Sequence, residues 1–512
     1  MRKFIRIKDK GGSQYAYEIT PYYDPETKNT KQKTKYLGVY KNGEIKRVQT
    51  KMPIGAYDYG EFVPLIRIIE ELGIEEKLGS ILPERQVYTI LTLALNRIVH
   101  PVAACNIRTW YERTYLSRVF GDIPISSQSL SEFMGAIGES TVPIDFSEQL
   151  IETVGAGNPL LYDITSLSSS SKLMDILEWG HNRDGDGLPQ LNLSIIANKD
   201  LGIPLSFDVY PGSIVDVTTL KNTTTKMKSL GVKNPTMILD RGFFSETNLN
   251  DLIDFKASFV MPGSYANNKI KAMVANSRKY IENPKYLNKF NGNVIFVRSS
   301  KLKMKKRSVD AYIFYDLARE KEDKTKFYNR LHDIEDKLKK RNLRPYEKAS
   351  MVFHDIADNL SKYFTFKVKD SRFVDVKMKP KTISRRVNRM GFTVILYQGK
   401  FRWDEVLTWT KERDVIEKMF LQLKNDLNAK PMRVHKTEVA KGWIFVGFIA
   451  LILRCRLSKL MIKKDLVKKY SIPSLLLTLG RLKQIELIDG SLMLTEVTKK
   501  QRDIFKALGL EP

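Results

Sequence analysis

The stretches Leu160-Leu161-Tyr162-Asp163-Ile164-Thr165-Ser166 and Met237-Ile238-Leu239-Asp240-Arg241-Gly242-Phe243 decide the fold. Each is a short apolar run that ends in a carboxylate and continues into polar or turn residues, which is the pattern of a buried β-strand. A carboxylate is rarely placed in a buried run unless it is paired or holds a metal ion. The two runs therefore predict that Asp163 and Asp240 meet at the edge of one sheet and form the floor of a divalent-metal site.

The segments around these runs predict a β-β-β-α-β-α-β order over residues 158–262. The predicted strands are 160–166, 190–198, 203–210, 236–240 and 257–261. Three successive strands, a helix and a fourth strand match the ribonuclease-H-like order, in which one carboxylate lies on the first strand and another just after the fourth. The chain is predicted to rejoin this core after residue 390, with a strand at 392–396 and helices at 403–427 and 437–463. The predicted fold class is a multidomain α+β or α/β protein with a ribonuclease-H-like core over 158–262 and 391–463.

Four further segments complete the predicted organisation. Residues 1–55 form a small β unit with a hairpin around Lys10-Gly11-Gly12-Ser13. Its interleaved basic and aromatic residues suit either a nucleic-acid-contacting sheet or an ordinary solvated hairpin. Residues 56–157 show helical periodicity, for a DNA-binding module or a scaffold. Residues 263–390 are expected to be an inserted α+β subdomain with a basic face, and residues 464–512 a helical tail.

The composition of the 512 residues favours a polyanionic partner. Lys and Arg number 85 against 58 Asp and Glu, for a net charge of +27. This surplus indicates nucleic acid first and argues against an enzyme of acidic small molecules, with general solubility as the alternative. Cys105 and Cys455 are expected to be buried free thiols, and the five histidines form no ligand pattern. No signal peptide or membrane-spanning run is recognisable, so a soluble cytoplasmic protein is expected.

A third carboxylate is expected from the helix after the returning strand. At about 100° per residue, Arg413, Glu417 and Lys424 fall within roughly 40° of one another, beside an apolar stripe. Glu417 then lies at the margin of the buried face with two cations along the same line. Glu412 and Asp414 point elsewhere and rank below it. The alternative is an ordinary surface Arg–Glu pair.

Three carboxylates suit phosphodiester cleavage, which needs an activated water and a stabilised leaving oxygen. Two Mg²⁺ or Mn²⁺ ions supply both, and these ions prefer oxygen ligands. Asp163 is expected to bridge the ions, while Asp240 and Glu417 each hold one. Arg413 and Lys424 are expected to bind the flanking phosphates, and Arg241 is a further candidate for such a contact.

Together, Tyr-Asp163-Ile-Thr-Ser, Leu-Asp240-Arg-Gly-Phe-Phe-Ser and the Arg413-x3-Glu417-x6-Lys424 helix resemble a DDE transposase of a prokaryotic insertion sequence. The similar branch carries an insertion subdomain between the second Asp and the Glu. The spacings agree, since 240 − 163 = 77 and 417 − 240 = 177. The segment Pro431-Met432-Arg433-Val434-His435 is also similar to that family. The resemblance implies cut-and-paste transposition. A homodimer would bind the terminal inverted repeats in a synaptic complex, cleave the DNA ends and join 3′-hydroxyls to target DNA.

Two aromatic positions bear on this resemblance. The family often has a Tyr three residues before the Arg, where this chain has Thr410 beside Trp409. By analogy with members that stack an aromatic side chain on a flipped base, Trp179, near His181 in the loop after the first strand, is a candidate wedge, with a packed surface tryptophan as the alternative. Two other functions stay open: a catalytically inactive, transposase-derived DNA-binding protein, or another ribonuclease-H-like nuclease. The expected location is the cytoplasm, in association with the nucleoid.

Overall fold

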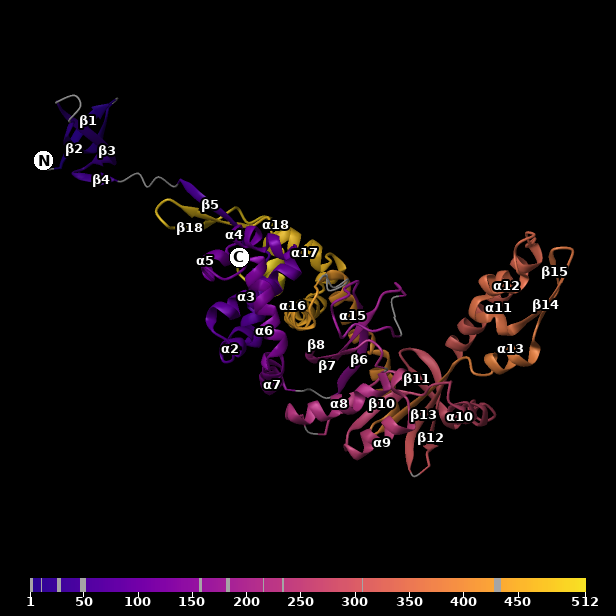
Figure 1. Cartoon of the computed structure of the whole chain (residues 1–512). Coiled ribbons are helices and arrows are strands. Elements are labelled where there is room, and N and C mark those ends of the chain that lie inside the picture. The colour runs from indigo at the N-terminus through magenta and orange to yellow at the C-terminus, as the bar shows by residue number, and fades with distance from the viewer. Residues whose placement is uncertain are drawn as a thin grey trace. The chain divides into compact units, whose positions relative to one another are not determined.

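The computed structural model describes residues 3–10, 12–24, 29–46, 52–155, 159–180, 185–214, 216–232, 234–305, 307–427 and 434–512. The chain divides into two compact units. The first comprises Met1–Pro64, Thr109–Asp122 and Lys468–Pro512, and the second comprises Leu65–Arg108 and Ile123–Val467. Figure 1 labels most of the elements of both units.

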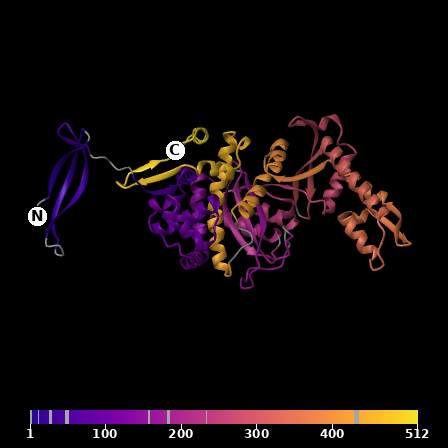
Figure 2. The same ribbon diagram turned by 90° about the horizontal axis from the view of Figure 1, so that it is seen from above.

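The N-terminal strands of the first unit form an antiparallel sheet, drawn in indigo beside the N label in Figure 2. Its strands are β1 (Phe4–Lys10), β2 (Ser13–Asp24), β3 (Asn29–Lys41) and β4 (Glu44–Lys46), paired in that order. The predicted hairpin is confirmed, since Lys10 pairs with Ser13 across the turn.

A second, three-stranded sheet in the first unit joins distant parts of the sequence. The strand β17 (Lys483–Leu487) pairs antiparallel with both β18 (Leu492–Leu494) and β5 (Pro53–Asp58). Helices α17 (Ile472–Leu479) and α18 (Lys499–Leu508) flank the hairpin in sequence. The prediction of a wholly helical tail is therefore wrong, because the strand depends on a partner more than 400 residues away.

The second unit is built on a nine-stranded mixed sheet in the order β11-β12-β13-β16-β10-β9-β6-β7-β8. Its strands are β6 (Leu160–Ser168), β7 (Gln190–Asn198), β8 (Ile203–Pro211), β9 (Thr236–Ile238), β10 (Ser258–Pro262), β11 (Leu287–Phe290), β12 (Asn293–Lys303), β13 (Ser308–Asp316) and β16 (Phe392–Gln398). The first three strands pair antiparallel, and β9 lies parallel to both β6 and β10. This arrangement is consistent with the predicted ribonuclease-H-like core.

The segment predicted as one insertion contributes to this sheet. Strands β11 to β13 extend the sheet next to β16, so the prediction that 263–390 is wholly a separate subdomain is wrong for them. Strand β13 pairs with β16, which lies beyond residue 390, and local sequence patterns do not reveal a partner outside the segment. The rest comprises α11 (Leu317–Lys340), α12 (Ala349–Ala357), β14 (Phe364–Lys369), β15 (Arg372–Met378) and α13 (Pro380–Val387). These elements share a hydrophobic core that includes Leu331, Phe353 and Phe373.

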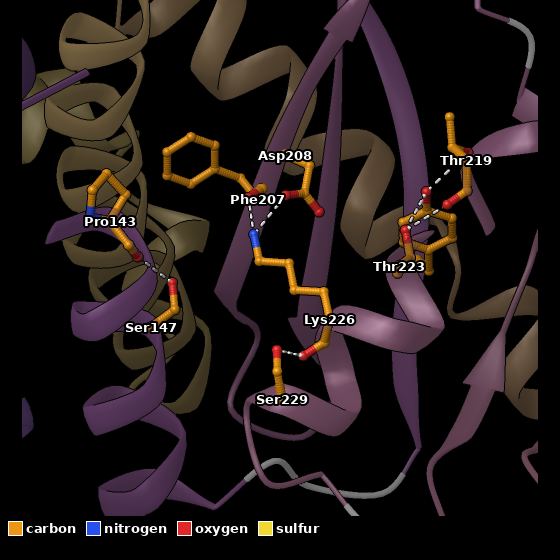
Figure 3. A network of polar contacts seen from close by, with 9 residues as sticks. Pro143, Ser147, Phe207, Asp208, Thr219, Thr223, Lys226 and Ser229 are labelled. Carbon is orange, nitrogen blue, oxygen red and sulfur yellow. Dashed lines mark hydrogen bonds and ion pairs between the residues drawn. The ribbon is translucent and has the colours of Figure 1, made fainter. Parts of the chain in front are cut away.

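Helices α8 (Asp216–Ser229) and α9 (Glu246–Asp254) follow the first three strands, and α8 is anchored to one sheet face by polar contacts (Figure 3). The Tyr162 hydroxyl lies 3.1 Å from Thr219 Oγ1 and accepts a hydrogen bond from Thr223 Oγ1. Lys226 Nζ donates to Asp208 Oδ1 and to the carbonyl oxygen of Phe207, both at 2.6 Å. Burial raises the pKa of Asp208, and the charge of Lys226 opposes that shift.

The opposite sheet face is covered by α16 (Thr437–Lys463), whose central residues are almost all buried. Phe207 of β8 lies 5.0 Å from Phe448 of this helix, measured between ring centroids. Helices α3 (Glu84–Val99), α6 (Ser127–Glu139) and α7 (Val142–Val154) also contact α16 or the sheet. The remaining α-helices are α1 (Val63–Leu72), α2 (Ile74–Gly79), α4 (Ile107–Glu112), α5 (Leu116–Val119), α10 (Asn268–Arg278), and α14 and α15, whose bounds are given with the site.

The two cysteines differ in exposure. Cys455 is buried in α16, and burial raises the pKa of its thiol to about 12. Cys105 is exposed, so its predicted burial is wrong; it lies on a short 3-10 turn, Ala104–Asn106, and not on a packed helix. In the part of the chain that the structure describes, no single helix has the length and apolarity to cross a bilayer, although the bent pair Glu84–Val99 and Ala104–Glu112 meets both criteria together.

Candidate active site

Asp163 and Asp240 are placed by the register of two parallel strands. In the β6–β9 pair, Leu160 lies opposite Met237 and Leu161 opposite Ile238, an offset of 77 residues. Asp163 and Asp240 are separated by the same 77 positions, two residues beyond the last pair. Because side chains alternate along a strand, residues at equal register on neighbouring strands project from the same face. Asp240 lies just beyond the end of β9, and its contact and that of Asp163 with the same Arg413 side chain show that the two carboxylates are on one side of the sheet.

The two aspartates differ in their surroundings. Asp163 lies within β6 and is buried, and its Oδ1 accepts a hydrogen bond from the backbone N–H of Ile164 at 2.8 Å. Asp240 follows the end of β9 and precedes a 3-10 turn, Arg241–Phe243, with its side chain partly open to solvent. The buried strand end thus supplies one shielded and one accessible carboxylate.

The helix predicted at 403–427 is interrupted. The structure has α14 (Trp403–Lys411), α15 (Asp414–Leu421) and a π-helical turn, Gln422–Asp426. α14 packs against β10 and β16, whereas α15 packs against β6. Because the two helices cover different strands, the chain bends between them and does not continue as one straight helix. The break places Arg413 at the N-terminus of α15.

The guanidinium of Arg413 contacts all three predicted carboxylates. Its Nη1 lies 2.5 Å from Asp240 Oδ1, and its Nη2 lies 3.4 Å from Asp163 Oδ2 and 2.9 Å from Glu417 Oε1. The Arg413 side chain is only 14% exposed, while that of Glu417 is 59% exposed. The structure therefore brings Asp163, Asp240 and Glu417 together around one partly buried cation.

The neighbouring acids of this helix point elsewhere. Glu412 forms an ion pair with Lys199 at 3.0 Å, and Asp414 forms one with Lys418 at 2.7 Å. Thr410 donates its hydroxyl to the carbonyl oxygen of Val406, so this side chain supports the helix backbone. Among the acids at 412, 414 and 417, Glu417 is the one that forms an ion pair with Arg413 in the described structure.

Lys424 differs from Glu417 in helix type and in exposure. It lies in the π-helical turn and is only 7% exposed, whereas Glu417 is open to solvent. A π turn has i→i+5 hydrogen bonds, so the α-helical angle of 100° per residue does not apply across it. The phosphate-binding role of Lys424 stays a prediction.

The other sequence candidates lie in loops around the sheet. Arg241 is exposed directly after Asp240, in a position open to a phosphate. Trp179 is 71% exposed, so the alternative of a packed tryptophan is wrong, and base stacking stays a prediction. His181 and Pro431-Met432-Arg433 lie outside the described residues.

Carboxylate oxygens are the ligands that Mg²⁺ and Mn²⁺ prefer, so the donor set of Asp163, Asp240 and Glu417 fits such an ion. In this structure the Arg413 guanidinium lies where these oxygens converge. Correspondingly, across the described residues no group of three or more His, Cys, Asp or Glu side chains has a geometry that could hold a metal ion. Metal binding at this site therefore requires Arg413 to move. The pair between Arg413 and Glu417 agrees with the predicted alternative of an Arg–Glu ion pair, whereas the contacts of Arg413 with Asp163 and Asp240 were not predicted.

A protein-family model described as "Transposase DDE domain" matches residues 163–453, which is more than half of the chain. The chain belongs to this transposase family. The match begins at Asp163 and includes Asp240, Arg413 and Glu417. At the family level, DDE transposases are metal-dependent enzymes of DNA cleavage and strand transfer.

No curated protein matches the chain. Among solved structures, the chain is similar to the cryo-EM structure of the piggyBac transposase synaptic complex with hairpin DNA, at 9% sequence identity and a TM-score of 0.37. That match covers 84% of this chain and 77% of the other chain.

Proposed function

We propose that this DDE transposase is a cut-and-paste enzyme of a prokaryotic insertion sequence. It binds the terminal inverted repeats of its element, cleaves the DNA at the ends and joins the 3′-hydroxyls to target DNA. The observation that carries the proposal is the convergence of Asp163, Asp240 and Glu417 on one cation, although they are separated by up to 254 residues (417 − 163). Three acids gathered in this way have no evident role in folding, because two of them are partly or largely solvent-accessible.

The proposed site residues hold two divalent ions. Asp163, the most buried of the three acids, would be a ligand shared by both ions, and Asp240 and Glu417 would each hold one. The ions, Mg²⁺ or Mn²⁺, supply an activated water and stabilise the leaving oxygen. Arg413, once displaced from the acids, is close enough to bind an adjacent phosphate through its two terminal nitrogens.

The proposed partners are double-stranded DNA, as element ends and as target, and a second copy of the chain in a synaptic complex. The net charge of +27 supports the DNA partner, since cations that neutralise phosphates release counterions and raise affinity. The proposed location is the cytoplasm, on the nucleoid.

The substitution Asp163→Asn tests the catalytic part of the proposal. It keeps the shape of the side chain and removes one metal-ligand charge, so Mg²⁺-dependent cleavage of end DNA should be lost while DNA binding in EDTA is retained. Glu412→Gln, at the C-terminus of α14 just before the helix that carries Glu417 and paired with Lys199, is the matched control and should keep activity. Cleavage by the Asp163→Asn protein at the wild-type rate would refute the assignment.

A strand-transfer assay separates transposition from other ribonuclease-H-like chemistry. Pre-cut end DNA and a supercoiled target should yield joined products that depend on Mg²⁺ and on Asp240. Cleavage without joining would indicate another nuclease, and salt-sensitive binding without either reaction would indicate an inactive DNA-binding protein.

A further inference from the structure

The N-terminal sheet β1–β4 carries a cluster of tyrosines on one face. In the strand register, Tyr17 lies opposite both Arg6 of β1 and Tyr36 of β3, and Tyr15 lies opposite Lys8. Paired residues of antiparallel strands share a face. We define the tyrosine face as Phe4, Arg6, Lys8, Tyr15, Tyr17 and Tyr36.

The tyrosine rings of this face lie close together and are accessible. The centroid of the Tyr36 ring lies 5.3 Å from that of Tyr17 and 6.2 Å from that of Tyr15. A bulge in β3 after Tyr36, with Gly38 at φ 139°, keeps Tyr36 opposite Tyr17. Tyr36 is exposed and the other two rings are partly exposed. The cluster is therefore an open aromatic surface and not a closed core.

Cations alternate with these rings. The Lys8 ammonium lies 5.3 Å from the centroid of the Tyr17 ring, and the Arg6 guanidinium lies 5.5 Å from that of Phe4. The same register places two acidic residues, Asp9 of β1 and Glu18 in the middle of β2, on the opposite face of the sheet. The tyrosine face thus combines exposed π surfaces with positive charge.

This combination matches the chemistry of an unpaired DNA strand. Unpaired bases stack on aromatic side chains while cations follow the phosphates. The bases of a duplex are already stacked on one another and offer no free face. The cores of protein–protein interfaces are depleted of charged residues, whereas this face places a cation at every second position of β1 from Arg6 to Lys10.

We propose that the tyrosine face binds unpaired DNA through base stacking on Tyr17 and Tyr36, with Arg6 and Lys8 on the phosphates. The inference deepens the proposed function and rests on it for the source of the ligand. If the enzyme cuts the two strands of an element end at staggered positions, unpaired nucleotides are left there for this face to bind. The binding itself requires neither metal nor cleavage.

The test measures binding by the full-length protein to fluorescein-labelled oligothymidine and to a duplex of the same length, by fluorescence anisotropy in EDTA. The double substitution Tyr17→Ala/Tyr36→Ala should weaken oligothymidine binding by about tenfold or more. Duplex binding should be unchanged. Tyr17→Phe/Tyr36→Phe keeps both rings and should retain oligothymidine affinity.

Tyr22→Ala is the matched control, since Tyr22 is an exposed tyrosine of β2 that falls on the opposite face, paired with Lys31. It should leave both affinities unchanged. Wild-type oligothymidine affinity in the double alanine variant, an equal loss with Tyr22→Ala, or an equal loss of duplex binding would overturn the proposal. A change in oligomeric state by light scattering, without a change in oligothymidine binding, would assign the face to a protein contact and also overturn it.

The outcome is independent of the catalytic proposal. Because the assay contains no metal, a protein that fails to cleave end DNA can still bind oligothymidine through this face. Conversely, active cleavage with no effect of the tyrosine substitutions would refute only the tyrosine face.

Discussion

Arg413 Nη1 lies 2.5 Å from Asp240 Oδ1, and the same guanidinium reaches Asp163 and Glu417. A side chain of the protein thus supplies one positive charge to the three acids that are proposed to bind metal. The attraction of this cation to each carboxylate offsets part of the mutual repulsion of the three acids. Arg413 and a divalent cation compete for the same oxygens.

Removal of this competitor should strengthen metal binding. For Arg413→Ala we expect an affinity for Mn²⁺ at least about tenfold higher than that of the wild type, measured by isothermal titration calorimetry without DNA. The melting temperature should also rise more on addition of Mn²⁺ than it does for the wild type, since a ligand of the folded state stabilises it. Lys418→Ala, which removes the partner of Asp414, is the control. Equal Mn²⁺ affinities for Arg413→Ala and the wild type would show that Arg413 does not obstruct the site.

Glu61 should make the first unit sensitive to pH. Burial, reinforced by the charge of Asp58, raises the pKa of Glu61 to about 7, while Lys483 opposes the shift. Because the folded pKa lies above the unfolded one, the stabilisation is fully present below about pH 4.5 and is lost as the pH rises through about 7. The full loss corresponds to roughly 3 kcal/mol.

Glu61→Gln stays neutral at every pH and should not show this loss. We expect the unfolding free energy of the wild type to fall more than that of Glu61→Gln between about pH 5 and about pH 8, as measured by urea denaturation. Glu148→Gln, an exposed position on α7, should follow the wild type. Parallel pH profiles for Glu61→Gln and the wild type would contradict the prediction.

The crossing of α6 and α16 should be intolerant of a methyl group at Gly138. A Cβ there would lie 1.9 Å from the carbonyl oxygen of Glu438, and backbone cannot yield as a flexible side chain does. Gly135 is on the same helix, but its Cβ would meet only side-chain atoms at 3.7 Å. Gly138→Ala should cost about 1–3 kcal/mol of stability, whereas Gly135→Ala should be neutral or gain up to about 1 kcal/mol from helix propensity. Thermal denaturation of the two variants checks this, and equal effects would exclude the close crossing as the cause.

The ion pair between Asp208 and Lys226 should depend on both partners. Lys226→Met leaves a largely buried carboxylate without its cation, so we expect a loss of about 3 kcal/mol. The double variant Asp208→Asn/Lys226→Met removes the charge as well and should recover part of that loss. Urea denaturation of the two single variants and the double variant gives the coupling energy. Additive effects in this cycle would show that the two residues do not interact energetically.

Several features followed from the sequence alone because they depend on local patterning. The apolar runs around Asp163 and Asp240 specified buried strands, and the run from Thr437 to Lys463 specified a buried helix, as the structure has them. The aspartates are 77 residues apart, which equals the register offset of β6 and β9. The two numbers agree because each aspartate lies two residues beyond the last paired position of its strand.

The tertiary structure alone decided how these elements meet. The break before Asp414 separates a helix that packs against β10 and β16 from one that packs against β6, and helical periodicity contains no sign of this break or of the π turn at Lys424. The pairing of β5 with β17 and the placement of Arg413 among three acids join residues that are hundreds of positions apart. Such contacts are set by the packing of the whole unit, whereas a sequence pattern reports only which face of its own element is apolar.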